Sequence, residues 1–173
     1  DIVDVIKDEA DKDYQLAAGI SQDVEADDSI MELTKARLPW LVLALLGGFI
    51  TVRVLGLFEG AMLEHGKLFF FTPLIAAMAG NVGVQSSAII VQGLANNTLS
   101  GSLFNRLVKE ISLSLLNGLI LASILFLGSH FLLNVEVIIG VIVTIALVSV
   151  IIIASLIGTF IPLLLDKFGI DPA

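Results

Sequence analysis

The sequence predicts an all-α membrane protein: a helical transmembrane bundle with four apolar spans, preceded by an acidic cytoplasmic helix. Two observations carry this prediction. The mean hydropathy is +0.99 and 57% of the residues are hydrophobic, which is far above the values of ordinary soluble domains. The charge is also divided unevenly, because eleven of the 17 acidic residues come before Arg37. We therefore expect a solvated acidic segment at 1–37 and a transmembrane domain at 38–173.

The acidic segment is expected to contain two helices. Residues 1–6 alternate apolar and acidic side chains, which favours the last strand of a preceding domain, and residues 8–19 are compatible with a helix that ends at Gly19. Ser29 followed by Glu32 is a capping-box pattern, which predicts a short cytoplasmic helix over 29–38. The chain begins with Asp and shows no signal peptide, so we expect it to be part of a longer protein.

The carboxylates before the first span allow two interpretations. A run of acidic residues is most often a solvated linker. Clustered carboxylates without basic neighbours are also hard oxygen ligands of the type that Mg²⁺ and Ca²⁺ take. The candidate regulatory metal ligands are Asp23, Glu25, Asp27, Asp28 and Glu32.

Four apolar stretches are each long enough to cross a bilayer, which needs about 20 helical residues. Lysine and arginine gather at one side of them, before the first stretch, between the second and third, and after the fourth, so the N-terminus is expected to be cytoplasmic. The predicted spans are 38–63, 68–95, 107–133 and 135–165.

The second span carries polar residues in its middle. At about 100° per residue, Asn81, Gln85 and Gln92 fall on one helix face, while Gly80 and Gly83 fall on the opposite face. The amide face suits the wall of a conduction path, and the glycine face allows a neighbouring backbone to come close.

Polar residues on the other spans add to this pattern. Glu59 lies near the outer end of the first span, where a carboxylate could attract cations, and Ser155 and Thr159 share a face of the fourth span. The third span aligns Glu110, Ser114, Asn117 and Gly118 on one side. Most serine, threonine and glycine residues in such helices serve packing, but four inward polar stripes together favour a conduction path.

The sequence shows no pattern typical of an enzyme. It has no cysteine, no nucleophile and base at a recognisable spacing, and no glycine-rich phosphate loop.

Several motifs in this order resemble the membrane domain of the MgtE family of magnesium channels and transporters, and the resemblance runs from about Val5 to Ala173. The most specific stretch contains Gly80-Asn81 and Gln85-Ser86. The motifs that carry the resemblance are Arg37–Trp40, Gly56–Glu59, Pro73–Gly93, Lys109–Glu110 and Pro162–Ala173.

The resemblance implies a homodimeric, Mg²⁺-gated channel in the cell membrane. Such a protein has a cytoplasmic N domain, a pair of CBS domains, a connecting plug helix and five membrane helices per subunit. Bound Mg²⁺ between the cytoplasmic domains and the plug helix would hold the pore shut. Asp171 would face the hydrated ion in the pore, with Asn81 and Ser155 near the path. Residues 1–37 would then be the tail of a CBS domain and the plug helix, and the chain would stop before the fifth membrane helix.

Two other functions stay open at this point. The ion could be another divalent cation, Mn²⁺, Co²⁺ or Ni²⁺, although ligands that are all oxygen favour a hard ion. The bundle could also be a non-conducting packing or signalling module, in which the polar residues only hold helices together.

Overall fold

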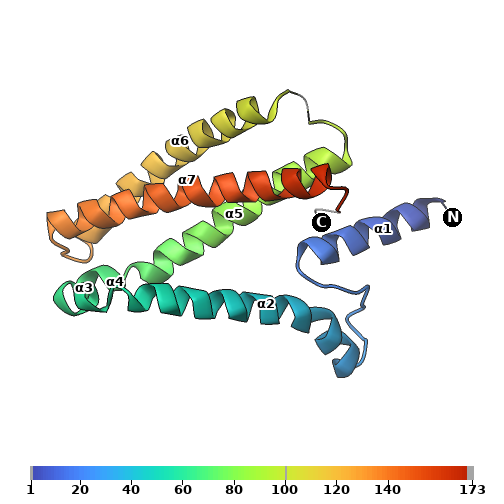
Figure 1. Cartoon of the computed structure of the whole chain (residues 1–173), viewed down its shortest axis with the longest axis horizontal. Coiled ribbons are helices and arrows are strands. Elements are labelled where there is room, and N and C mark those ends of the chain that lie inside the picture. The colour runs from blue at the N-terminus through green and yellow to red at the C-terminus, as the bar shows by residue number, and fades with distance from the viewer. Residues whose placement is uncertain (1, 100, 171–173) are drawn as a thin grey trace. The chain divides into compact units, whose positions relative to one another are not determined.

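The computed structural model describes residues 2–99 and 101–170, and within them every regular element is a helix (Figure 1). Four helical stretches among the described residues are long and apolar enough to cross a membrane, which confirms the predicted all-α membrane class. The chain divides into two compact units, the first ending at Ala61 and the second beginning at Met62. The helices are α1 (Ile2–Ala17), α2 (Ile30–Gly56), α3 (Glu59–Glu64), α4 (Gly66–Phe69), α5 (Thr72–Ala95), α6 (Leu103–Phe131) and α7 (Val137–Lys167).

In the first unit, the strand predicted for residues 1–6 is wrong, because α1 is already helical at Ile2. Ile2 and Ile6 are four residues apart and therefore share a helix face as readily as they fit a strand alternation. An isolated strand would also have no partner in the described part of this chain, whereas a helix satisfies its own backbone. The predicted stop is confirmed: Gly19 has φ +79, in the left-handed region that favours glycine after a helix end.

The segment after α1 is tied down by side-chain hydrogen bonds. Gln15 donates to the Val24 carbonyl at 2.7 Å and accepts from the Val24 amide at 3.1 Å. The Ser21 hydroxyl donates to the carbonyl of Ala36, a fully buried residue of α2, at 2.9 Å. The acidic segment is therefore locally ordered against the start of α2.

The capping box that opens α2 is confirmed. Ser29 Oγ accepts from the Glu32 amide, and the Glu32 carboxylate accepts from the Ser29 amide at 3.1 Å. The short helix 29–38 and the first span are, however, one continuous helix with Pro39 inside it, so the predicted boundary at 37/38 marks a change of composition within a helix. That helix ends at Gly56, earlier than residue 63, where the Leu57 amide bonds to the Val54 carbonyl in a tight last turn.

In the second unit, α7 is the helix on which the others pack, because it contacts both α5 and α6 (Figure 1). Its buried residues recur every three or four positions, as expected when one face of a helix is covered by neighbours. The helix continues through Pro162 to Lys167. The buried stripe consists of Gly140, Val143, Leu147, Ile151, Ser155, Thr159 and Pro162.

Glycines mark the places where these helices come closest. A Cβ added at Gly158 of α7 would lie 3.2 Å from the Cα of Gly83 on α5 and nearer still to its carbonyl oxygen. A Cβ at Gly118 of α6 would meet Val148 of α7 at 3.5 Å. The close backbone approach predicted for the glycine face of the second span is thus confirmed at Gly83, while a Cβ added at Gly80 would meet no described atom of another part of the chain within 4 Å.

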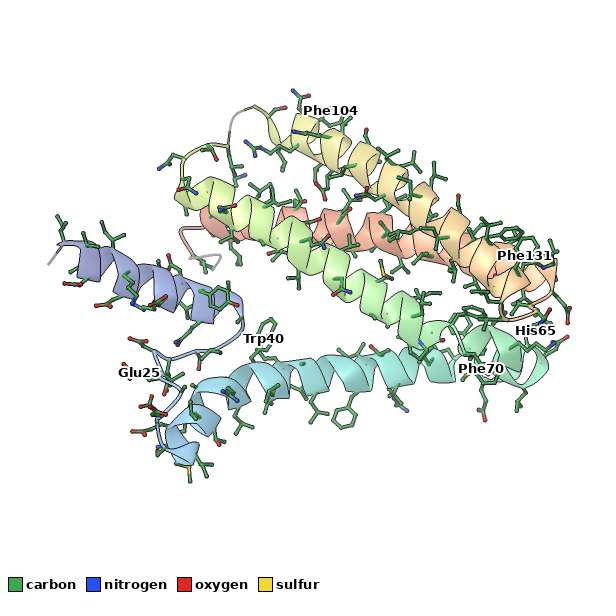
Figure 2. All side chains as sticks on the ribbon, turned by 180° about the vertical axis from the view of Figure 1, so that it is seen from behind. Glu25, Trp40, His65, Phe70, Phe104 and Phe131 are labelled. Carbon is green, nitrogen blue, oxygen red and sulfur yellow. The ribbon has the colours of Figure 1, made fainter. Side chains whose placement is uncertain are left out.

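The predicted second span is divided near its start. Gly66–Phe69 forms a short helix, and α5 begins at Thr72 with Pro73 in its first turn, where a missing N–H costs nothing. Exposed aromatic residues mark the two ends of α6, Phe104 and Phe131 (Figure 2).

Candidate functional site

Three amide side chains line one open pocket between α5 and α6. Asn81 and Gln85 come from α5 and Asn117 comes from α6. The pocket has a volume of about 380 Å³. We call it the amide groove; its remaining lining residues are Met78, Val82, Ile120 and Leu121.

The amide groove lies at the middle of both helices. Asn117 is the central residue of Leu103–Phe131, and Asn81 and Gln85 lie in the middle third of Thr72–Ala95. With a rise of about 1.5 Å per residue, these positions are more than about 10 Å from either helix end. Polar groups at this depth in a membrane are costly unless they meet a partner or water, so they are typical of a transport pathway.

The three amides have unused hydrogen-bonding capacity. Asn81, Gln85 and Asn117 are exposed, and within the part of the chain that the structure describes none of their side chains makes a hydrogen bond. Each amide offers one carbonyl oxygen and two N–H donors. The groove can therefore accept and donate hydrogen bonds to a polar occupant without breaking bonds of its own.

The sequence does not single out Glu110 as a site residue, although its spacing with Ser114 places it on a polar face. The structure gives it a partner on another helix: Ser86 Oγ of α5 donates to Glu110 Oε1 of α6 at 2.6 Å. Ser86 is buried and Glu110 is half-buried. A carboxylate inside an apolar span requires such a partner, because an unpaired polar group there is expensive.

Ser155 and Thr159 face neighbouring helices of the same chain. Ser155 Oγ lies 2.5 Å from Ser114 Oγ, which joins α7 to α6, and both Ser155 and Thr159 are 1% exposed. The Thr159 hydroxyl is buried without a hydrogen-bond partner among the described residues. For these two residues the structure directly supports a packing role, and their assignment to a pore remains a prediction.

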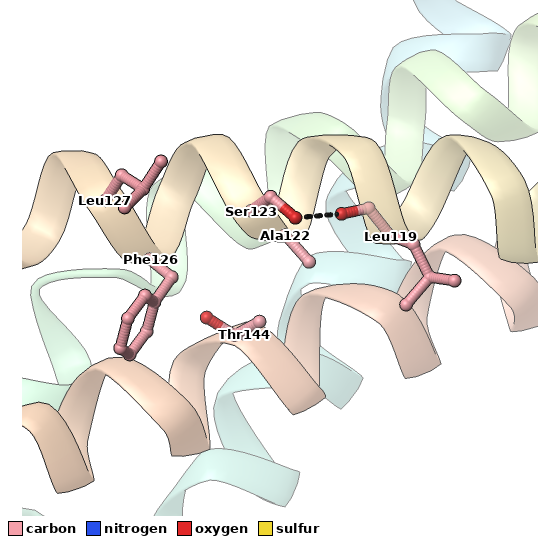
Figure 3. Close-up of a pocket in the computed structure, with 6 residues that line it drawn as sticks. All are labelled: Leu119, Ala122, Ser123, Phe126, Leu127 and Thr144. Carbon is pink, nitrogen blue, oxygen red and sulfur yellow. Dashed lines mark hydrogen bonds between the residues drawn. The ribbon is translucent and has the colours of Figure 1, made fainter.

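A second pocket, of about 450 Å³, lies between α6 and α7 (Figure 3) and differs chemically from the amide groove. Its two hydroxyl residues are satisfied by their own helices: Ser123 donates to the Leu119 carbonyl at 2.8 Å and Thr144 to the Gly140 carbonyl at 2.7 Å. The other residues that line it are apolar. This pocket therefore offers a polar ligand no hydroxyl donor that is not already used within its own helix.

In the first unit, two of the five candidate regulatory carboxylates are engaged locally. Asp28 Oδ2 accepts from the Glu25 amide at 2.8 Å, and Glu32 accepts from the Ser29 hydroxyl at 2.6 Å. Among residues 2–99 and 101–170, no three acidic or histidine side chains are gathered as a metal-binding group. A regulatory site formed by Asp23, Glu25, Asp27, Asp28 and Glu32 therefore remains a prediction.

Glu59 and Asp171 are the remaining predicted site residues. Glu59 is exposed in the first turn of α3. Asp171 lies outside the described residues.

The fold and the amide groove define a class: a multi-pass helical membrane protein with polar groups at mid-span, which is typical of transporters and channels. Comparison with known proteins is more specific. The model of the MgtE family, described as a divalent cation transporter, matches residues 72–173. The chain therefore belongs to the MgtE family.

Three curated relatives named "Magnesium transporter MgtE" match the whole chain. It is 33% identical to the protein from Bacillus subtilis, 35% to that from Enterococcus faecalis and 32% to that from Thermus thermophilus. The chain covers 38% of the first two relatives and 39% of the third. It is thus similar to somewhat more than a third of each transporter.

Proposed function

We propose that this chain is the membrane-embedded part of a magnesium transporter and that its α5 helix lines the path of the ion. The observation that carries the proposal is the pair of amides at Asn81 and Gln85, which lie at mid-span without hydrogen-bond partners in the described structure. Membership of a divalent cation transporter family supports a metal cation as the substrate. The names of the relatives support Mg²⁺ in particular and transport rather than catalysis.

The chemistry of magnesium favours such a path. Mg²⁺ loses its water reluctantly, so it is better passed along as a hydrated ion than stripped by a cage of protein ligands. We assign Asp171 as the carboxylate that attracts the ion in the pore, and Glu59 as a carboxylate at the outer approach. A pore-lining role for Ser155 and Thr159 would require α7 to move away from the helices that pack on it, because both side chains are buried.

We further propose that two copies of the chain form the channel and that Mg²⁺ regulates it. Residues 1–37 would be the tail of a CBS domain and the plug helix, with the N-terminus in the cytoplasm, and residues 38–173 would be the transport domain. The carboxylates of the acidic segment would bind the regulatory Mg²⁺. Their concentration in one segment supports this, since eleven acidic residues precede Arg37.

The test is Mg²⁺ flux into proteoliposomes that contain the complete gene product, with Mg²⁺ varied on the regulatory side. We expect flux that falls as regulatory Mg²⁺ rises, and that changes in rate or selectivity in Asp171→Ala. Flux of Mn²⁺, Co²⁺ or Ni²⁺ in preference to Mg²⁺ would reassign the substrate. The absence of any cation flux would leave a non-conducting packing or signalling module.

A further inference from the structure

We propose that Asn117 completes a binding station for a fully hydrated divalent cation in the amide groove, opposite Asn81 and Gln85. This inference rests on the proposed transport function and deepens it, because it assigns a residue of α6 to the path. The three amides would contact the water shell, and no protein atom would touch the metal.

The positions of the three residues favour one shared ligand. Asn81 and Gln85 are separated by about one turn of α5, so their side chains project toward the same side, and Asn117 closes the groove from α6. Amide side chains from two helices thus line the same groove. A ligand with hydrogen-bonding groups on several sides could engage both walls at once.

The chemistry of the lining selects for a hydrated ion over a dehydrated one. The groove is lined by three amides and four apolar side chains, and none of its lining residues is charged. Mg²⁺ holds its waters tightly, and contacts with neutral amides do not offset the free energy needed to remove them. Metal-bound waters are good hydrogen-bond donors, and the carbonyl oxygens of Asn81, Gln85 and Asn117 are acceptors.

The size of the groove agrees with this ligand. Water occupies about 30 Å³ per molecule, so an octahedral shell of six waters needs about 180 Å³. The groove is open and offers about 380 Å³, so a hydrated ion can enter it.

The pocket between α6 and α7 provides an internal comparison. It is larger, about 450 Å³, yet its Ser123 and Thr144 hydroxyls already donate to backbone carbonyls. Volume alone therefore does not make a polar site in this bundle. The amide groove differs because its polar groups are unpaired within the described chain.

The experiment uses a cysteine reporter in the wall of the groove, Ile120→Cys, in the complete gene product reconstituted in liposomes. The chain contains no cysteine, so any further cysteine elsewhere in the gene product is first replaced by serine. Hexaamminecobalt(III), which does not exchange its ligands and imitates a hydrated Mg²⁺, serves as the probe. We expect it to slow the reaction of the reporter thiol at position 120 with a water-soluble maleimide.

Variants of Asn117 then test the assignment. Asn117→Leu should weaken protection by the probe about 2- to 10-fold, the value of one hydrogen bond, whereas Asn117→Asp should strengthen it by adding a negative charge. Asn105→Leu, the same substitution near the start of α6, should leave protection unchanged, and a Ser123→Cys reporter in the other pocket should not be protected at all.

The outcomes separate this inference from the proposed function. If the protein carries Mg²⁺ but the probe does not protect the reporter at position 120, the binding station is overturned and transport is left intact. The same holds if the probe protects the reporter equally in the wild type and in both Asn117 variants. Protection that depends on Asn117 in a protein without Mg²⁺ flux supports the station and overturns transport. A reporter thiol that never reacts with the maleimide also overturns the station, because the groove would then be covered by protein or lipid.

Discussion

Ser86 Oγ donates a hydrogen bond of 2.6 Å to Glu110 Oε1, and this bond joins α5 to α6 within the second unit. Ser86 follows Gln85 directly, so the bond fixes the rotation of the helix that carries the amides. Neither Ser86 nor Glu110 lines the groove itself.

Removing this bond should loosen the contact between the two helices. We expect Ser86→Ala to lower the free energy of unfolding in detergent by about 0.6–2 kcal/mol, the usual range for hydrogen bonds between membrane helices. Ser112→Ala is the matched control, since its exposed hydroxyl bonds to the Val108 carbonyl of its own helix. A double-mutant cycle with Glu110→Ala checks the pair: effects that simply add would show that the two residues are not coupled.

The contact between Gly83 and Gly158 should not tolerate a side chain. A methyl group at Gly158 would press against the backbone of α5, so Gly158→Ala is expected to cost about 1–3 kcal/mol through overpacking. Gly80→Ala, on the same α5 helix as Gly83, would place its methyl group more than 4 Å from any described atom of another part of the chain, so it should be neutral or stabilising because alanine favours a helix. Thermal unfolding of both variants measures the difference, and equal destabilisation would contradict the close approach.

Water accessibility should divide the predicted pore-lining residues into two groups. Single cysteines at positions 81, 85 and 117 are expected to react with a water-soluble maleimide, because these positions line the open groove. Cysteines at positions 155 and 159 should react at least about 10-fold more slowly, since these side chains are 1% exposed. Rapid labelling at position 155 would instead support its pore-lining assignment and a separation of α7 from α6.

The acidic segment should change the response to magnesium if its carboxylates bind the regulatory ion. We expect Asp23→Asn combined with Asp27→Asn to raise by several-fold the Mg²⁺ concentration that halves the flux, because each substitution removes a charged oxygen ligand. Asp8→Asn combined with Asp11→Asn, on α1, provides a control with the same change in charge. If both pairs of substitutions raise this Mg²⁺ concentration equally, the effect comes from the net charge of the segment, and Asp23 and Asp27 are not specific ligands.

Much of the fold and part of the site can be predicted from local patterns. The capping box at Ser29 needs only the chemistry of two residues three positions apart, and the apolar spans need only length and hydropathy. The amide face of α5 follows from helical periodicity, which places Asn81 with Gln85. The strand predicted for residues 1–6 is wrong because a period of two cannot be distinguished from a helix over so few residues.

The sequence by itself determined that this chain is an all-helical membrane protein with polar groups at mid-span, because hydropathy and helical periodicity are local properties of the chain. Only the tertiary structure decided which face meets which neighbour. It paired Ser86 with Glu110, buried Ser155 and Thr159 against other helices, and brought Asn117 to the amides of α5. The physical reason is that periodicity assigns a residue to a face, whereas its partner depends on how the helices pack against one another.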